Sequence, residues 1–221
     1  MPSLPKHSLP KDSLRQAETV EEWKQHFAVA LRKSTDDITV FRGELSVQIE
    51  LDQLITVLTR LKDETGGAFT QLSDITAVDY PERTPRFDLI YQLLSVTLNQ
   101  RIRLVVPIAE DAVAPSVTAL FGCADWAERE IWDMFGIFFN DHGDLRRLLT
   151  DYGFEGHPLR KDFPLTGHVE VRYDDTQRRV INEPVHLVQE FRDFDFLSPW
   201  EGMHNELGGN AAKADPDKTA K

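Results

Sequence analysis

Three β-rich runs in the middle of this chain constrain its fold most, because strands must pair before their backbone polar groups are satisfied. The runs cover residues 69–78, 87–96 and 101–108. In the last run Ile102, Leu104 and Val106 alternate with more polar positions, which is typical of a sheet with one face on a core. The turn at Asn99-Gln100 is short enough to join the last two runs as a hairpin.

A second hairpin and a first helix are predicted before these strands. Residues 38–41 and 45–49 are β-rich and lie on either side of Gly43, as the strands of a hairpin would. Apolar residues at helical spacing precede them in residues 23–31. Thr19 followed by Glu22 suits a capping box at the start of that helix.

A second helix is predicted between the two groups of strands. Asp52 suits its N-cap, and Gly66-Gly67 is expected to end it. Its expected apolar face consists of Leu54, Ile55, Leu58 and Leu61. The order of helices and strands predicts an α+β fold with a mixed or antiparallel sheet covered by helices.

Residues 126–200 differ in composition from the part before them. They contain 13 of the 21 aromatic residues, together with Pro158, Pro164, Pro184 and Pro199. Proline interrupts helices and strands, so we expect an extended, mostly irregular arm. Burial of its aromatic residues against another protein is the favoured interpretation, and packing onto the chain's own sheet is the alternative.

Four parts are therefore expected along the 221 residues. They are a flexible leader in 1–17, an α+β domain in 18–125, a helix with a docking arm in 126–201, and a disordered tail in 202–221. The leader lacks the apolar segment of a secretory signal. No run approaches the ~20 apolar residues that a membrane span needs.

Charge and cysteine content argue against several functions. The formal net charge of −12 repels nucleic-acid phosphates and anionic lipid headgroups, so membrane association is expected only through partners. Cys123 is the one cysteine, whereas an iron–sulfur cluster normally needs about four thiolates. No glycine-rich phosphate-binding motif follows a strand. We expect no cofactor and no metal on this chain.

The docking part is predicted to begin with an amphipathic helix. Asp125 suits its N-cap with Glu128 as reciprocal partner, and Gly136 suits its end. The expected apolar face consists of Ala127, Ile131, Met134 and Phe135, and the expected polar face of Glu128, Arg129, Glu130 and Asp133. A short strand over 137–139 and a turn over 140–144 should follow.

Acid–base chemistry or metal binding is possible in principle for Glu130, Asp133 and His142. Glu130 and Asp133 lie three residues apart beside Arg129, so charge pairing along the helix accounts for them. A hydrogen-bonding role is favoured for His142. We therefore expect no catalytic residue on this chain.

Basic and aromatic residues further along are the candidates for interactions. Arginine pairs with two carboxylate oxygens at once, so the basic residues could contact a partner or this chain's own acids. The candidates are Arg146, Arg147, Arg160, Lys161, Phe163 and Trp200. Proline geometry is expected to keep residues 157–164 extended.

Residues 128–137, His142 and 144–149 together resemble the signature of the C subunit of respiratory complex I, the NADH:quinone oxidoreductase. The acid–arginine–acid opening, Asp133, His142 and a basic residue before a leucine pair stand at the family's spacing. One departure is Gly143, where relatives usually have proline. The likeness covers roughly residues 125–201, and the first half fits only by its general pattern.

The resemblance implies a non-catalytic structural subunit of the hydrophilic arm of a proton-pumping complex. Its extended arm would wrap the subunit that contributes most of the quinone site, beside the subunit with the terminal cluster. FMN and the Fe–S clusters would then lie on partner subunits. The implied location is peripheral, on the cytoplasmic side of the inner membrane or the matrix side in mitochondria.

Two alternatives remain open at this point. The same fold could serve a related membrane-bound hydrogenase or oxidoreductase, although the ending over 194–201 favours the respiratory complex. A free-standing acidic enzyme using Glu130, Asp133 and His142 is the alternative of another class.

Overall fold

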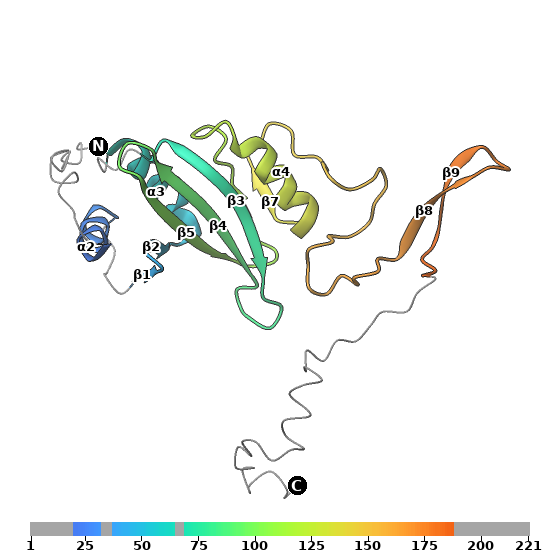
Figure 1. Ribbon diagram of the computed structural model, residues 1–221, viewed down its shortest axis with the longest axis horizontal. Helices are drawn as coiled ribbons and strands as arrows, with labels where there is room; N and C mark the ends of the chain where they lie inside the picture. The colour runs from blue at the N-terminus through green and yellow to red at the C-terminus, as the bar shows by residue number, and fades with distance from the viewer. Residues whose placement is uncertain (1–19, 32–36, 65–68, 188–221) are drawn as a thin grey trace, which may run out of the picture. The chain divides into compact units, whose positions relative to one another are not determined.

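The computed structural model describes residues 20–31, 37–64 and 69–187, and its contacts divide the chain into two units between Gly167 and His168 (Figure 1). The first unit contains a five-stranded sheet with its helices, and the second contains a hairpin. The predicted leader, the capping residue Thr19, the stop at Gly66-Gly67, the tail and Trp200 lie outside the described residues.

The main sheet is mixed, as predicted. Its strands are β1 (Ile38–Phe41), β2 (Glu44–Gln48), β3 (Gln71–Asp79), β4 (Phe87–Ser95) and β5 (Gln100–Ile108). They lie in the order β1-β2-β5-β4-β3, with β2 parallel to β5 and all other neighbours antiparallel. The helical segment after β2 carries the chain across the sheet to β3 at the opposite edge. Antiparallel pairing of β3 with β4 and of β4 with β5 then places β5 beside β2 and parallel to it.

Both predicted hairpins of this sheet are confirmed, with one correction. Arg42 and Gly43 take φ of 53° and 81° between β1 and β2, the left-handed conformation that two-residue hairpin turns require. The β4–β5 turn is longer than predicted, because it covers residues 96–99 and Gln100 already pairs with Ser95. Asn99 there takes φ of 50°.

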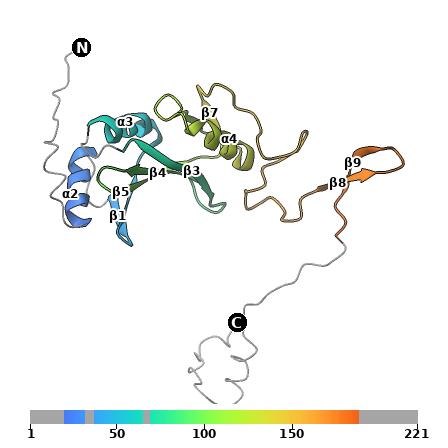
Figure 2. The same ribbon diagram turned by 45° about the horizontal axis from the view of Figure 1, so that its top comes forward.

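One face of the sheet is buried under three helices, α2 (Val20–Leu31), α3 (Leu54–Thr59) and α4 (Ala124–Phe135). Every second residue from Phe87 to Leu93 in β4 and from Ile102 to Ile108 in β5 belongs to this core, so the alternation in the sequence correctly predicted the buried face. Figure 2 shows α3 and α4 on the same side of the sheet. No helix among the described residues is long and apolar enough to cross a membrane.

The start of α3 differs from the prediction. Asp52 lies inside a 3-10 turn over Leu51–Gln53, and Gln53 occupies the N-cap without a side-chain hydrogen bond. Leu54, Leu58 and Leu61 are buried as predicted, whereas Ile55 is exposed. The prediction of Asp52 as the cap was wrong because the chain tightens into a 3-10 turn before the helix proper begins.

The N-cap prediction for α4 was also wrong. The helix begins two residues earlier than expected, with Cys123 at the N-cap, and Asp125 lies within the first turn. Its predicted end is confirmed, because Gly136 takes φ of 79° and donates its N–H to the carbonyl of Trp132. Strand β7 (Phe138–Asn140) follows and pairs in parallel with β6 (Val113–Pro115).

Residues 141–167 contain no helix or strand, in agreement with the predicted irregular arm. In the second unit, β8 (Val169–Asp174) and β9 (Arg179–Pro184) form an antiparallel hairpin. This hairpin was not predicted, because the whole arm was expected to be irregular. The signal was present, since Val169, Val171 and Tyr173 alternate with charged residues.

Candidate functional site

Three of the charged residues on the expected polar face of α4 are buried. The side chains of Glu128 and Asp133 are fully buried, and Arg129 is nearly so, whereas Glu130 is exposed. Buried charges need partners, because an unpaired charge in a protein interior is costly. Those partners come from loops outside the helix, so the predicted pairing of helix charges with one another was wrong.

Glu128 holds the loop that follows β6. Its Oε1 accepts the N–H of Val117 at 2.7 Å, and its Oε2 accepts the hydroxyl of Ser116 at 2.7 Å. Burial raises the pKa of Glu128, while these two hydrogen bonds oppose the rise. Glu128 is therefore not the reciprocal partner of an N-cap but a link between α4 and the neighbouring loop.

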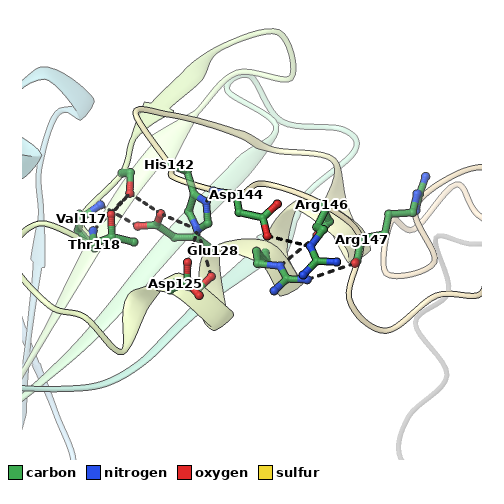
Figure 3. Close-up of polar contacts among 10 residues, drawn as sticks. Val117, Thr118, Asp125, Glu128, His142, Asp144, Arg146 and Arg147 are labelled. Atoms are coloured by element: carbon green, nitrogen blue, oxygen red, sulfur yellow. Dashed lines mark hydrogen bonds and ion pairs between the residues drawn. The ribbon is translucent and has the colours of Figure 1, made fainter.

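His142 ties the turn after β7 to the first turn of α4 (Figure 3). Its buried imidazole accepts the N–H of Asp144 at Nδ1, so its proton is on Nε2. Nε2 then donates to the carbonyl oxygen of Asp125 at 3.1 Å, with the Asp125 carboxylate at 3.3 Å. The predicted hydrogen-bonding role of His142 agrees with this geometry.

Arg129 and Asp133 bind the same loop from the next turns of the helix. The guanidinium of Arg129 donates to the carbonyls of Arg146 and Arg147 at 3.3 and 3.4 Å. Oδ2 of Asp133 accepts three backbone N–H groups, at 2.7–3.0 Å, from Leu148, Leu149 and Thr150.

The other carboxylate oxygen of Asp133 is equally occupied. Oδ1 accepts the guanidinium of Arg147 at 2.9 Å and the hydroxyl of Thr150 at 2.7 Å. Burial by itself would raise the pKa of Asp133, but the hydrogen bonds from Thr150, Leu149 and Leu148 outweigh it. They hold this pKa well below its usual range.

The C-terminal end of α4 accepts hydrogen bonds from residues 157–160. Carbonyls in the last turn of a helix lack intrahelical partners. Here the carbonyls of Asp133, Met134 and Phe135 accept hydrogen bonds from His157 Nδ1, Leu159 N–H and Arg160 Nε at 3.0, 3.0 and 2.6 Å, respectively. A Cβ on Gly136 would lie 2.6 Å from His157 Nε2, so this close approach also requires glycine.

A third buried carboxylate, Asp79 at the end of β3, binds the residues that follow. Arg86 donates to both of its oxygens at 2.7 and 2.9 Å, and Lys161 donates its backbone N–H at 2.7 Å. The Arg86 guanidinium is the main cause of the lowered pKa of Asp79. Arg86 also pairs with Asp162 at 3.0 Å, and Arg160 pairs with Glu110 at 2.6 Å.

The predicted interaction residues differ in what they contact and in how far they are exposed. Arg147 and Arg160 bind groups of this chain, so the alternative of pairing with the chain's own acids is the one observed. Arg146 pairs with Asp144 in an exposed position. Lys161 is exposed and uses its backbone, and Phe163 packs on Phe154 with ring centroids 5.9 Å apart.

Ser116, Val117, Asp79 and Arg86 were not predicted from the sequence. Ser116 and Val117 lie 12 and 11 residues from Glu128, and Asp79 lies 82 residues from the Lys161 N–H, although it is only seven residues from Arg86. No local pattern marks the long-range pairs. The described residues contain no group of three or more potential metal ligands.

Apolar side chains are exposed on the same segment whose polar groups are bound internally. Leu149 is 61% exposed, Leu165 is 88% exposed, and Tyr152 is fully exposed. Trp126, Phe138 and Leu159 are also exposed to about half or more. Large apolar side chains are thus exposed on and beside the segment whose polar groups bind other parts of this chain.

A family model described as "Respiratory-chain NADH dehydrogenase, 30 Kd subunit" matches residues 47–169, which include β5, α4 and the anchored segment, residues 141–167. The chain belongs to this family. The match extends well before residue 125, so the likeness is wider than the C-terminal signature alone suggested.

Curated relatives of this family agree over most of the chain. A protein named as the C subunit of NADH-quinone oxidoreductase from Paramagnetospirillum magneticum is 54% identical over 84% of this chain and 94% of its own length. A protein of the same name from Rhodobacter capsulatus is 48% identical over 90% of this chain and its whole length.

A solved structure is also similar to this chain. The chain is similar to one chain of the membrane-bound sulfane sulfur reductase, an archaeal respiratory membrane complex. The two are 27% identical with a TM-score of 0.55, over 66% of this chain and 85% of the other.

Proposed function

We propose that this chain is a structural subunit of an NADH:quinone oxidoreductase, equivalent to the relatives that bear this enzyme's name. It docks onto the subunit that forms most of the quinone site and stabilises it, beside the subunit with the terminal cluster. Electrons pass from NADH through FMN and Fe–S clusters to quinone on those partner subunits. This chain carries no electron and no catalytic group in that path.

The observation that carries the proposal is that residues 141–167 use their polar and their apolar groups differently. Their charged and backbone groups bind α4 and Asp79, while the side chains of Leu149, Tyr152 and Leu165 are exposed. Apolar and aromatic side chains supply most of the energy of protein interfaces. A segment that is ordered before binding also loses little conformational freedom on docking.

The acidic residues of α4 support a structural role. A general acid or base must be free to exchange a proton with a substrate. Glu128 accepts two hydrogen bonds, and Asp133 accepts five at its two carboxylate oxygens. Both carboxylates are therefore occupied by this chain's own donors. Asp133 is one of the three residues that the free-standing enzyme would use, so its occupancy argues against that alternative.

Its location follows from the same proposal. The chain is held at the cytoplasmic side of the inner membrane, or at the matrix side in a mitochondrion, by its partner subunits. Its net charge of −12 gives no attraction to anionic lipids, so the contact is through protein.

A related membrane-bound oxidoreductase is the second candidate host, because the similar solved chain comes from a sulfane sulfur reductase complex. Identity of 54% to an NADH-quinone oxidoreductase subunit, against 27% to that chain, favours the first host.

Affinity purification of the tagged full chain from its native membranes tests the proposal. Flavin, several Fe–S clusters and NADH oxidation should co-purify. Nickel or sulfur-reducing activity without flavin would support the second host. A chain recovered alone that binds a metal and turns over a substrate would overturn both.

A further inference from the structure

Three consecutive backbone N–H groups converge on one carboxylate oxygen in this chain. Leu148, Leu149 and Thr150 donate to Oδ2 of Asp133 at 3.0, 2.7 and 2.9 Å. Successive N–H groups that face one point form a concavity suited to an anion. In this protein the anion is a side chain from α4, which is 15 to 17 residues earlier in the sequence.

The loop is built around this negative charge. The guanidinium of Arg147 and the hydroxyl of Thr150 donate to the other oxygen, and the carboxylate is fully shielded from solvent. Without the carboxylate, three N–H groups and a cation would face each other with no acceptor between them. Buried donors without partners are unfavourable, so the loop would open or take up another anion.

The same loop determines where its apolar side chains lie. The N–H of Leu149 points inward to Asp133, while its side chain is 61% exposed. Tyr152 follows two residues after Thr150 and is fully exposed. The anchored backbone therefore fixes the outward direction of Leu149 and the start of the segment that carries Tyr152.

We propose that residues 147–150 form an anion-binding loop whose permanent ligand is the Asp133 carboxylate, and that this ligand positions Leu149 and Tyr152 for contact with an apolar surface of a partner subunit. The loop's own arginine is neutralised internally, so the partner surface need not be acidic. Asp133 is thus a positioning residue. The docking half of this inference rests on the proposed function, whereas the anion-binding half does not.

Chemical rescue tests the anion-binding half on the purified full chain. In Asp133→Ala, hydrogen exchange at the amides of residues 148–150 should become faster by about tenfold or more, the size expected for lost hydrogen bonds to a charged acceptor. Formate fits the space left by the carboxylate and should slow exchange again. Chloride at the same concentration should not, and Glu130→Ala, which removes an exposed charge from the same helix, should exchange as wild type.

Two results would overturn the anion-binding half. One is unchanged protection of these amides in Asp133→Ala, and the other is faster exchange that formate does not slow. If Asp133→Ala fails to fold, Thr150→Val serves in its place. It removes one donor and keeps the carboxylate, so it should raise exchange at residues 148 and 149 by a smaller factor, and no rise would count against the inference.

Complex assembly tests the docking half. Leu149→Ser/Tyr152→Ser should leave amide protection at residues 148–150 normal but lower the amount of assembled complex on native gels severalfold. Asp133→Ala should lower both. Normal assembly of the double variant would overturn the docking half alone. Failure of the proposed function is separate, because the wild-type chain would then bring down no respiratory subunits.

Discussion

Residues 141–167 and the β8–β9 hairpin are held in opposite ways. The first segment has no regular secondary structure, yet buried side chains from α4 and β3 fix its backbone at many points. The hairpin has regular pairing over six residues of each strand, but most of its side chains are exposed. Irregular backbone can therefore be the better-anchored part of a chain, and regular pairing does not guarantee burial.

The hairpin has two chemically different faces. Val169, Val171 and Tyr173 share a face with Val180 and Pro184, all exposed. Arg172 and Glu183 form an ion pair on the other face. A two-stranded hairpin alone is marginally stable in water.

The largest effect is expected from the buried end of the anchoring network. Asp79→Ala removes the acceptor of Arg86 and of the Lys161 N–H, and it leaves a mostly buried arginine without its main partner. Breaking a buried pair in this way should lower the free energy of unfolding by about 3–5 kcal/mol. Urea denaturation of the purified chain measures it, with Asp74→Ala on the exposed side of β3 as control. A loss equal to that of the control would show that the anchor contributes little.

Gly136→Ala tests the close approach at the end of α4. The alanine would need positive φ, and its Cβ would lie 2.6 Å from His157 Nε2. We expect a loss of about 1–3 kcal/mol in the free energy of unfolding, the usual size of such backbone strain. Gly143→Ala is the matched control, because nothing lies within 4 Å of the added methyl group. Equal stability of the two variants would contradict the structure here.

Arg146 and Arg147 are adjacent, but Arg146 pairs with an exposed carboxylate and Arg147 with a buried one. Arg147→Met removes hydrogen bonds to the Asp133 carboxylate and the Gly156 carbonyl and should cost about 1.5–3 kcal/mol of unfolding free energy. Arg146→Met removes an exposed pair with Asp144 and should cost at most about 1 kcal/mol. Thermal unfolding of the two variants side by side measures the difference. A larger loss for Arg146→Met would reverse the comparison.

Acid should weaken the contacts that Asp79 and Asp133 make with residues 141–167. The pKa values of Asp79 and Asp133 are lowered in the folded chain, so their contribution to stability is present above their ordinary pKa of 3.8 and is lost as pH falls below it. Glu128 has a raised pKa and contributes in the opposite direction, with stability lost as pH rises through that value. Unfolding free energies between pH 5 and pH 2 should therefore fall less steeply in Asp133→Asn. An unchanged slope would exclude Asp133 as a source.

The smallest effect is expected in the hairpin. Arg172 and Glu183 pair at 2.9 Å on a solvent-exposed face, where such pairs contribute little. Arg172→Ala should leave the thermal unfolding midpoint of the full chain unchanged, with Arg147→Met as the contrasting variant. A drop comparable to that of Arg147→Met would mean that the hairpin depends on its charged face.

Sequence patterns predicted the parts of the fold that depend on local periodicity. The alternation in residues 101–108 identified β5 and its buried face, and the apolar spacing in residues 127–135 identified α4 with its glycine end. The alternation of Val169, Val171 and Tyr173 is equally clear, but the prolines of the arm favoured an irregular structure there.

The chemistry of the site could not be predicted in the same way. An acid three or four residues from an arginine looks identical in sequence whether it faces water or a loop. Asp133 was therefore expected to pair along the helix. Its distance of 2.7 Å from the Leu149 N–H shows that it binds the backbone of a loop instead. Ser116 contacts Glu128 and Asp79 contacts Lys161 only because tertiary packing brings them together. No short sequence window contains both partners.

We propose that this chain supports assembly of the complex and takes no part in its chemistry. Phe163→Ala removes a ring that packs on Phe154 in the anchored segment and tests that claim directly. In membranes where this variant is the sole copy, the measurement is NADH:quinone turnover per bound flavin beside the amount of assembled complex. Assembly should fall while turnover per flavin stays at the wild-type value. Normal assembly with lost turnover would contradict the claim.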